Sequence, residues 1–192
     1  MLREIFISKT RVKLLETFLV DPTQMYHVRD LVRKTGDEIN AVRRELARME
    51  RVGMVKKEPR GNRLYYWFRH DYSLYNDLLS MVAKTTGIGA AIIKNRSKLG
   101  NIQVVMLSGK FVRHLPRKSP DEVDILIVGN ITLSELGVVV RAEEERRSQT
   151  INYTPMTEEE LKFRRTRRDP FLQEILAQSR IFVVGSDEDL VG

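Results

Sequence analysis

The sequence contains no cysteine, and this absence excludes several kinds of chemistry at once. A chain without cysteine forms no disulfide, offers no thiol nucleophile and cannot hold zinc through thiolates. The apolar stretch at residues 87–93 is far shorter than the ~20 residues of a membrane-spanning helix. Charged residues interrupt the N-terminus, which leaves no room for the apolar region of a signal peptide. We therefore expect a cytoplasmic protein that has no membrane partner.

Positive charge is unevenly distributed along the 192 residues, which carry a net charge of +7. Residues 1–86 hold 17 Lys and Arg against 11 Asp and Glu, a net charge of +6. Residues 87–192 hold 16 against 15, a net charge of +1. This length allows two small domains, which we place at residues 1–86 and 87–192. A polyanion such as nucleic acid suits the basic first domain.

Apolar spacing in the first domain predicts three helices followed by a β-hairpin. The expected bounds are 8–20, 27–34 and 38–51 for the helices and 54–58 and 63–68 for the strands. Gly36 permits a tight turn before the third helix, and Asp37 is expected to cap that helix. A fourth helix, at 73–85, carries an apolar stripe formed by Leu74, Leu78, Met81 and Val82. Three helices and a hairpin with a basic tip are typical of a winged helix-turn-helix.

The third helix is the candidate recognition helix of this arrangement. An α-helix fits the major groove of DNA, where Arg and Asn side chains reach base edges. Basic groups at the hairpin tip can lie along a minor groove or a phosphate backbone. The candidate DNA-binding residues are Asn40, Arg43, Arg44, Arg48, Arg60, Asn62 and Arg63. The alternative, that the arginines only solvate an exposed helix face, stays open at this point.

Residues 8–86 resemble an ArsR-type winged helix-turn-helix domain. The resemblance lies in VRDLV at 28–32, VRRELARME at 42–50 and GNRLYY at 61–66. It implies a transcriptional regulator that binds double-stranded DNA as a homodimer, on two half-sites. Flanking helices often make the dimer contacts in that family. The apolar stripe of the fourth helix could form such a contact or pack onto its own domain.

Four consecutive aromatic residues, 65–68, form the only aromatic cluster of the chain. Such a cluster could stack the bases of single-stranded nucleic acid. Side chains alternate between the two faces of a strand, which splits the cluster and favours ordinary core packing. The three histidines, His27, His70 and His114, are too scattered in the sequence to indicate a metal site.

Helices and strands alternate in the second domain, which predicts an α/β or α+β fold around a small mixed sheet. The expected helices are 90–99, 133–147, 157–165 and 170–177, and the expected strands are 102–107, 123–128, 150–154 and 181–184. An acidic tail is expected after the last strand.

Residues 104–128 are similar to the minimal nucleotidyltransferase fold of the DNA polymerase β superfamily. The family pattern is a strand, Gly-Ser, an Arg-Gly loop and Asp-x-Asp at the next strand. Carboxylates two residues apart on a strand point the same way and can hold a divalent metal that bridges nucleotide phosphates. The resemblance implies that Gly109, Lys110 and Arg113 bind a nucleotide. It also implies that Glu122 and Asp124 are the metal-binding and catalytic candidates.

The chain departs from this pattern at several positions. Lys110 stands where the family has serine, His114 replaces a glycine, and Glu122 replaces the first aspartate. The strand expected at 150–154, which should bring a third carboxylate, contains no acid. Two-metal chemistry tolerates little misplacement of its ligands. These departures favour the loss of catalysis.

We therefore expect a DNA-binding transcriptional regulator whose inactive nucleotidyltransferase-like domain serves ligand sensing or assembly and requires no cofactor. One alternative is an active nucleotidyltransferase, of a toxin–antitoxin type, that uses Mg²⁺ and a nucleotide. Another alternative is a non-enzymatic interaction module.

Overall fold

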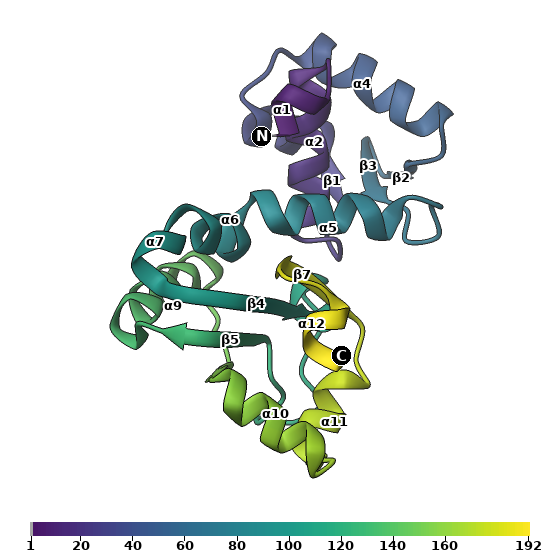
Figure 1. Ribbon diagram of the computed structural model, residues 1–192. Coiled ribbons are helices and arrows are strands. Elements are labelled where there is room, and N and C mark those ends of the chain that lie inside the picture. The colour runs from purple at the N-terminus through teal and green to yellow at the C-terminus, as the bar shows by residue number, and fades with distance from the viewer. Residues whose placement is uncertain (1) are drawn as a thin grey trace. The chain divides into compact units, whose positions relative to one another are not determined.

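A computed structural model describes residues 2–192, except for the side chains of Arg3 and Ile5. Contacts divide the chain into two compact units, Met1–Thr85 and Thr86–Gly192 (Figure 1). The sequence places this boundary one residue later. Helices and strands occur in both units, so the chain has a mixed α/β fold with two small sheets. Within the described residues, no helix is both long enough and apolar enough to cross a membrane.

The first unit packs its helices against a three-stranded antiparallel sheet with the order β1-β3-β2. Its elements are α1 (Leu2–Ile5), α2 (Lys9–Val20), β1 (Tyr26–His27), α3 (Val28–Thr35), α4 (Ile39–Arg51), β2 (Val55–Arg60), β3 (Arg63–Phe68) and α5 (Tyr75–Thr85). The helices and strands expected between residues 8 and 85 are confirmed to within two residues at each end. The sequence did not indicate α1 or β1, because segments this short carry no periodic pattern.

Local chemistry sets the ends of the helices in this unit. Ser8 Oγ accepts a hydrogen bond from the amide of Arg11 at the start of α2. Gly36 ends α3 in the left-handed conformation, with φ of 65°, and its amide donates to the carbonyl of Val32. The expectation for Asp37 is wrong: Glu38 occupies the cap position of α4 and makes no side-chain capping bond. Asp37 instead accepts a hydrogen bond from Lys13 Nζ at 2.5 Å, because α2 brings that ammonium group to the turn.

The second unit contains a four-stranded mixed sheet with the order β6-β5-β4-β7, in which only β5 and β6 are parallel. Its elements are α6 (Gly87–Lys94), α7 (Arg96–Leu99), β4 (Gly100–Ser108), α8 (Gly109–Val112), β5 (Ile125–Ile131), α9 (Leu133–Arg147), β6 (Tyr153–Met156), α10 (Glu158–Thr166), α11 (Pro170–Leu176), β7 (Arg180–Val184) and α12 (Asp187–Val191). The small mixed sheet is therefore confirmed.

Two central strands, β4 and β5, form the core of the second unit. Val104, Met106, Leu126 and Val128 pack with buried residues of α10, α11 and α12. The alternate residues of both strands are also buried, so both faces of these strands are covered. The loop at 113–124 therefore leads into a strand, β5, that is anchored in the core.

The structure corrects three expectations in the second unit. The strand expected at 150–154 is β6, which begins three residues later at Tyr153. The single helix expected at 90–99 is two helices, α6 and α7, which meet at Asn95. The expected acidic tail contains the helix α12, because Ser186 and Asp189 cap each other in a reciprocal pair of hydrogen bonds. Leu190 of that helix is fully buried, which attaches the acidic segment to the core.

Candidate functional site

The helix α4 buries one face and exposes a basic one. Val42, Leu46 and Met49 are buried in the first unit. The candidate DNA-binding residues on this helix are all exposed: Asn40, Arg43, Arg44 and Arg48. The helical period predicts Asn40, Arg44 and Arg48 on the outward face, with Arg43 close by, and their exposure confirms this prediction.

The exposed arginines of α4 differ in their partners. Arg48 Nη1 lies 2.7 Å from Glu45 Oε1, and Arg11 Nε lies 2.8 Å from the other oxygen of this buried carboxylate. Burial raises the pKa of Glu45, but the two guanidinium groups outweigh burial and lower it below its ordinary value. Arg43 and Arg44 form no ion pair or side-chain hydrogen bond with any residue that the structure describes. Arg48 therefore neutralises Glu45, whereas Arg43 and Arg44 are available to an external anion.

A groove of about 510 Å³ lies between the start of α3, the helix α4 and the hairpin. Arg29, Arg43 and Arg63 line it, and none of the three forms an ion pair with a described residue. Its other lining residues are His27, Val28, Ile39, Asn62, Leu64 and Tyr66. No aspartate or glutamate is part of this lining. We call this hollow the basic groove.

The structure brings only part of the sequence-predicted set into the basic groove. Arg43, Asn62 and Arg63 line it, while Arg60 lines a different pocket. Arg60 Nε lies 2.8 Å from Glu58 Oε1, and its guanidinium carbon lies 5.8 Å from the ring centre of Tyr65. The hairpin tip therefore divides its basic groups between two surfaces.

The sequence interpretation missed two residues of the basic groove, Arg29 and His27. His27 caps α3, because its Nδ1 accepts a hydrogen bond from the amide of Arg29 at 3.3 Å. His27 belongs to β1, which pairs with β3 and so lies beside the hairpin. A helix start directly before Arg29 was visible in the sequence, but the pairing of β1 was not.

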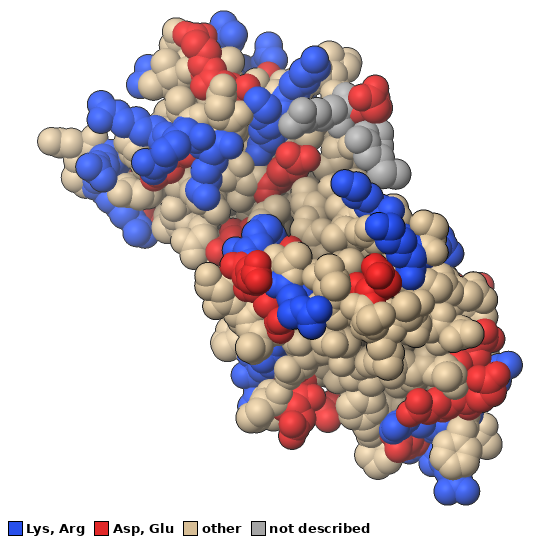
Figure 2. Space-filling model, turned by 90° about the vertical axis from the view of Figure 1, so that its left-hand side faces the viewer, with Lys and Arg blue, Asp and Glu red and all other residues tan. Residues whose placement is uncertain are grey.

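Lys and Arg side chains gather on the face of the first unit in Figure 2, the upper part of that view.

The aromatic cluster splits as the strand period predicts. Tyr66 and Phe68 are buried, and Tyr65 and Trp67 are partly exposed. The ring of Phe68 packs near Phe18 and Tyr75, which confirms core packing for that half of the cluster.

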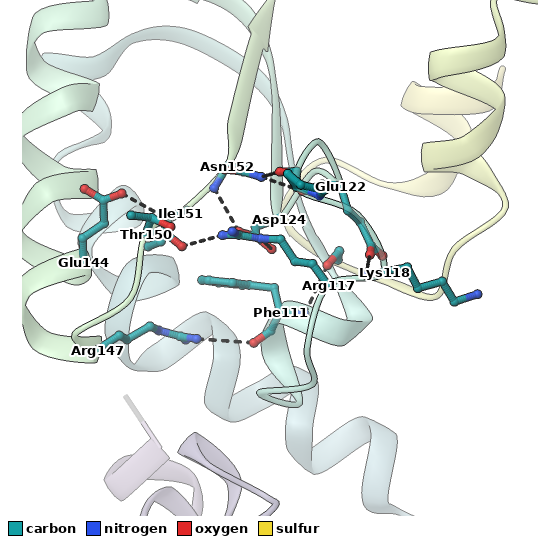
Figure 3. A network of polar contacts seen from close by, with 12 residues as sticks. Phe111, Arg117, Lys118, Glu122, Asp124, Glu144, Arg147, Thr150, Ile151 and Asn152 are labelled. Carbon is teal, nitrogen blue, oxygen red and sulfur yellow. Dashed lines mark hydrogen bonds and ion pairs between the residues drawn. The ribbon is translucent and has the colours of Figure 1, made fainter.

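In the second unit, Glu122 and Asp124 are almost fully buried, and each is bound by a cation. Lys110 Nζ lies 2.6 Å from Glu122 Oε1, and the amide of Lys118 donates to the other oxygen of Glu122 at 2.6 Å. Arg117 Nη2 lies 2.5 Å from Asp124 Oδ2. Figure 3 shows the Arg117 guanidinium between Asp124 and the carbonyl of Thr150, to which it also donates.

The charge of each carboxylate is stabilised within the chain. Burial raises the pKa of Glu122, but hydrogen bonds from Lys110 and Lys118 outweigh it and lower the pKa below 4.5. The hydrogen bond to Asp124 raises the pKa of Arg117. The backbone N–H of Asn152, in the segment expected to carry a third acid, donates a hydrogen bond to Asp124 Oδ2 at 2.9 Å. Arg117 completes this network, and the sequence interpretation did not single it out.

The residues expected to bind a nucleotide also form hydrogen bonds within the chain. The amide of Gly109 donates to the carbonyl of Ser179 at 2.6 Å. Arg113 Nη1 donates to the carbonyl of Gly109 at 3.1 Å and to Ser179 Oγ at 3.3 Å. A Cβ atom on Gly109 would lie 2.0 Å from Ser179 Oγ, so this glycine allows close packing against the loop before β7.

A metal ion would have to displace the cations that already bind these carboxylates. The described residues contain no group of three or more His, Cys, Asp or Glu side chains placed to hold a metal. Glu122 and Asp124 would therefore be the acidic ligands only after Lys110 and Arg117 withdrew. In the arrangement observed, the network orders the loop at 113–124 and holds no open coordination site.

Comparison with known proteins returns no family model, no curated protein and no solved structure that matches this chain.

Proposed function

We propose that the first unit binds double-stranded DNA and that the protein is a transcriptional regulator. The basic groove carries this proposal, since three arginines line it without an ion pair and without an acidic neighbour in the lining. Cations with no internal partner can neutralise phosphates without first breaking a bond in the protein. An interface with DNA is typically rich in such positive charge.

The arrangement of α4 supports a division of roles within this interface. Its exposed face carries Asn40 and Arg44, which have the side-chain chemistry that recognises adenine and guanine edges in the major groove. Arg29, Arg43 and Arg63 lie where α3, α4 and the hairpin meet. We assign the three groove arginines to phosphate contacts and Asn40 and Arg44 to base contacts.

We propose a structural or assembly role for the second unit rather than nucleotidyl transfer. Lys110 and Arg117 occupy the two carboxylates on which a metal would depend. The amide of Gly109 is likewise bonded within the chain. No bound cofactor is part of this proposal.

The homodimer also remains part of the proposal. The apolar stripe consists of Leu74, just before α5, and three residues of α5. Two of these, Leu78 and Val82, are buried, and α5 packs against α2. Leu74, at 50% exposed, is the member still open to a partner. Sedimentation analysis of the full chain, with and without DNA, tests whether two copies associate.

The proposed function is tested with the variant Arg43→Ala/Arg63→Ala. At low salt, we expect the full chain to bind a pool of random duplexes, measured by fluorescence anisotropy. The double variant should bind about 100-fold more weakly, because hydrogen bonds to charged groups contribute about 1.5 kcal/mol each.

The matched control is Arg141→Ala/Lys162→Ala, which removes the same charge from exposed positions of the second unit. Neither control residue forms an ion pair with a described residue. If the control weakens binding as much as the groove variant does, binding is non-specific and the proposal fails. It fails equally if the unmodified chain shows no binding at low salt.

A further inference from the structure

A second pocket of the first unit, of about 640 Å³, lies on the side of the hairpin that holds Arg60. Its apolar lining includes Pro22 and Met25, from the segment between α2 and β1, and Trp67 of β3. Small-molecule sites in proteins are clefts of roughly 300–1,000 Å³ with a largely apolar lining and a few polar groups. The size and the lining of this pocket agree with that description. We call it the Trp67 pocket.

Most of the charge in the lining of the Trp67 pocket is already paired. Arg60 binds Glu58 at 2.8 Å, and Arg69 binds Asp71 at 2.6 Å. The hydrogen bond from Arg69 lowers the pKa of Asp71 to about 2, so that pair stays charged at neutral pH. These two ion pairs leave little net charge for a ligand to recognise.

Lys56 is the exception among the cations that line this pocket. Its side chain is exposed, and its ammonium group forms no ion pair or hydrogen bond with a residue that the structure describes, although its charge helps to lower the pKa of Asp71. Lys56 and Trp67 are directly opposite each other in the pairing of β2 with β3, so their side chains leave the same face of the hairpin. The pocket therefore combines one available ammonium group with one flat aromatic surface.

Trp67 also carries a polar group, its indole N–H. Its indole N–H donates no hydrogen bond to any described residue, although the side chain is only partly exposed. A partly buried indole N–H usually has an acceptor. His70 provides no comparable group, because its Nε2 lies 3.2 Å from the carbonyl oxygen of Pro22.

We propose that the Trp67 pocket binds a planar aromatic monocarboxylate. The ring of the ligand stacks on the Trp67 indole, beside the thioether of Met25, and its carboxylate binds Lys56. One unpaired cation selects a ligand with one negative charge. A nucleotide with several phosphates would leave most of its charge without a partner in this pocket. Planarity follows from the flat surface of the indole.

The test uses benzoate as the probe and the full chain without DNA. Trp67 is the only tryptophan of the chain, so all tryptophan emission reports on this pocket. We expect benzoate to change that emission saturably, with the same dissociation constant by calorimetry. Benzamide, which has the same ring but no charge, should bind at least about tenfold more weakly.

The variant Lys56→Gln should weaken benzoate binding at least about tenfold and leave benzamide binding unchanged. The matched control is Lys84→Gln, an exposed lysine of α5 that forms no ion pair with a described residue and lies outside the pocket. Trp67→Phe, followed by calorimetry, keeps a ring in the pocket while removing the indole N–H. It should weaken benzoate binding less than Lys56→Gln does.

Three results would overturn the proposal. Benzoate causes no saturable change, or benzamide binds as tightly as benzoate, or Lys56→Gln behaves like Lys84→Gln. A fourth result, in which a short duplex displaces benzoate in direct competition, would assign the pocket to the DNA surface and also overturn it. Since the binding titrations contain no DNA, their failure leaves the proposed DNA-binding function untouched.

Discussion

Arg117 is the residue on which the polar network of the second unit depends most. Its guanidinium contacts both the carboxylate of Asp124 and the carbonyl of Thr150, and so connects the loop before β5 to the segment before β6. The side chain of Asp124 is 6% exposed, so water cannot take over the role of Arg117. A buried charge that loses its partner costs much more than the pair contributes.

We expect Arg117→Ala to lower the free energy of unfolding of the second unit by about 3–5 kcal/mol, the cost of an uncompensated buried charge. Urea unfolding followed by far-ultraviolet circular dichroism measures this change. Emission from Trp67 follows the first unit separately. Adding Asp124→Asn to the variant should restore part of the loss, because it removes the charge. Arg141→Ala, at an exposed position, should change stability by less than about 0.5 kcal/mol. Equal effects of Arg117→Ala and Arg141→Ala would contradict this account.

Glu122 predicts how the second unit responds to acid. Its pKa in the folded chain lies below the ordinary 4.5, because Lys110 and the amide of Lys118 outweigh burial. Its contribution to stability is therefore fully present above about pH 4.5 and is lost as the pH falls through the folded-state pKa.

We expect Glu122→Gln to flatten the decline in unfolding free energy below pH 4.5, measured by urea titrations at a series of pH values. The exposed Glu174→Gln serves as the control and should keep the steeper decline of the unmodified chain. A decline in Glu122→Gln as steep as in the control would show that other carboxylates cause the acid response.

At the scale of elements, the turn between α3 and α4 depends on one glycine. Gly36 has φ of 65°, and a Cβ atom there would meet nothing within 4 Å. A substitution there therefore affects only the backbone conformation, without a steric clash. Gly137, inside α9, is the opposite case, since a Cβ atom would make only ordinary contact, 3.5 Å from Arg141 Nη1.

We expect Gly36→Ala to destabilise the first unit by about 1 kcal/mol, because left-handed backbone is unfavourable for alanine. Gly137→Ala should stabilise the second unit by about 0.5–1 kcal/mol, because alanine restricts the unfolded chain and favours helix. Urea unfolding measures both changes in unfolding free energy. Trp67 emission follows the first unit, and circular dichroism follows the second. Changes of the same sign would contradict the assigned conformations.

The elements that the sequence predicted well are those with a clear local pattern. The apolar period of α4 and the hairpin turn lie within short segments, so a linear scan finds them, although the turn is limited to Gly61 and Asn62 because Pro59 and Arg60 pair in β2. β1 has only two residues and exists because it pairs with β3, some forty residues later in the chain. The sequence contains the capping pair of α12, Ser186 and Asp189, but the acidic composition of this segment led to the prediction of a tail instead of a helix.

At the scale of the whole molecule, charge is the property that relates sequence to proposed function. The three arginines of the basic groove, which are assigned to phosphates, form no ion pair with a described residue. Each phosphate neutralised on duplex DNA contributes about 0.9 to the slope of log affinity against log salt concentration.

We expect that slope to be about −2.7 for each protomer, measured by anisotropy between low and physiological salt. Arg29→Ala should weaken binding to all duplexes alike and reduce the slope by about 0.9, since Arg29 is assigned to a phosphate. Arg48→Ala should leave the slope nearly unchanged, because Arg48 is paired with Glu45. An equal loss of slope in both variants would contradict the distinction between paired and unpaired arginines.

The sequence by itself determined the mixed fold, the bounds of most helices and strands, and the outward basic face of α4. These properties depend on apolar periodicity and turn residues, which act over a few neighbouring positions. Only the tertiary structure decided which charges remain available. Glu45 binds Arg48, three residues along the same helix, and also Arg11 of α2, while Arg117 binds Asp124 across the loop. Ion pairing depends on the distances between side chains in the folded chain, so composition cannot distinguish a paired arginine from an unpaired one.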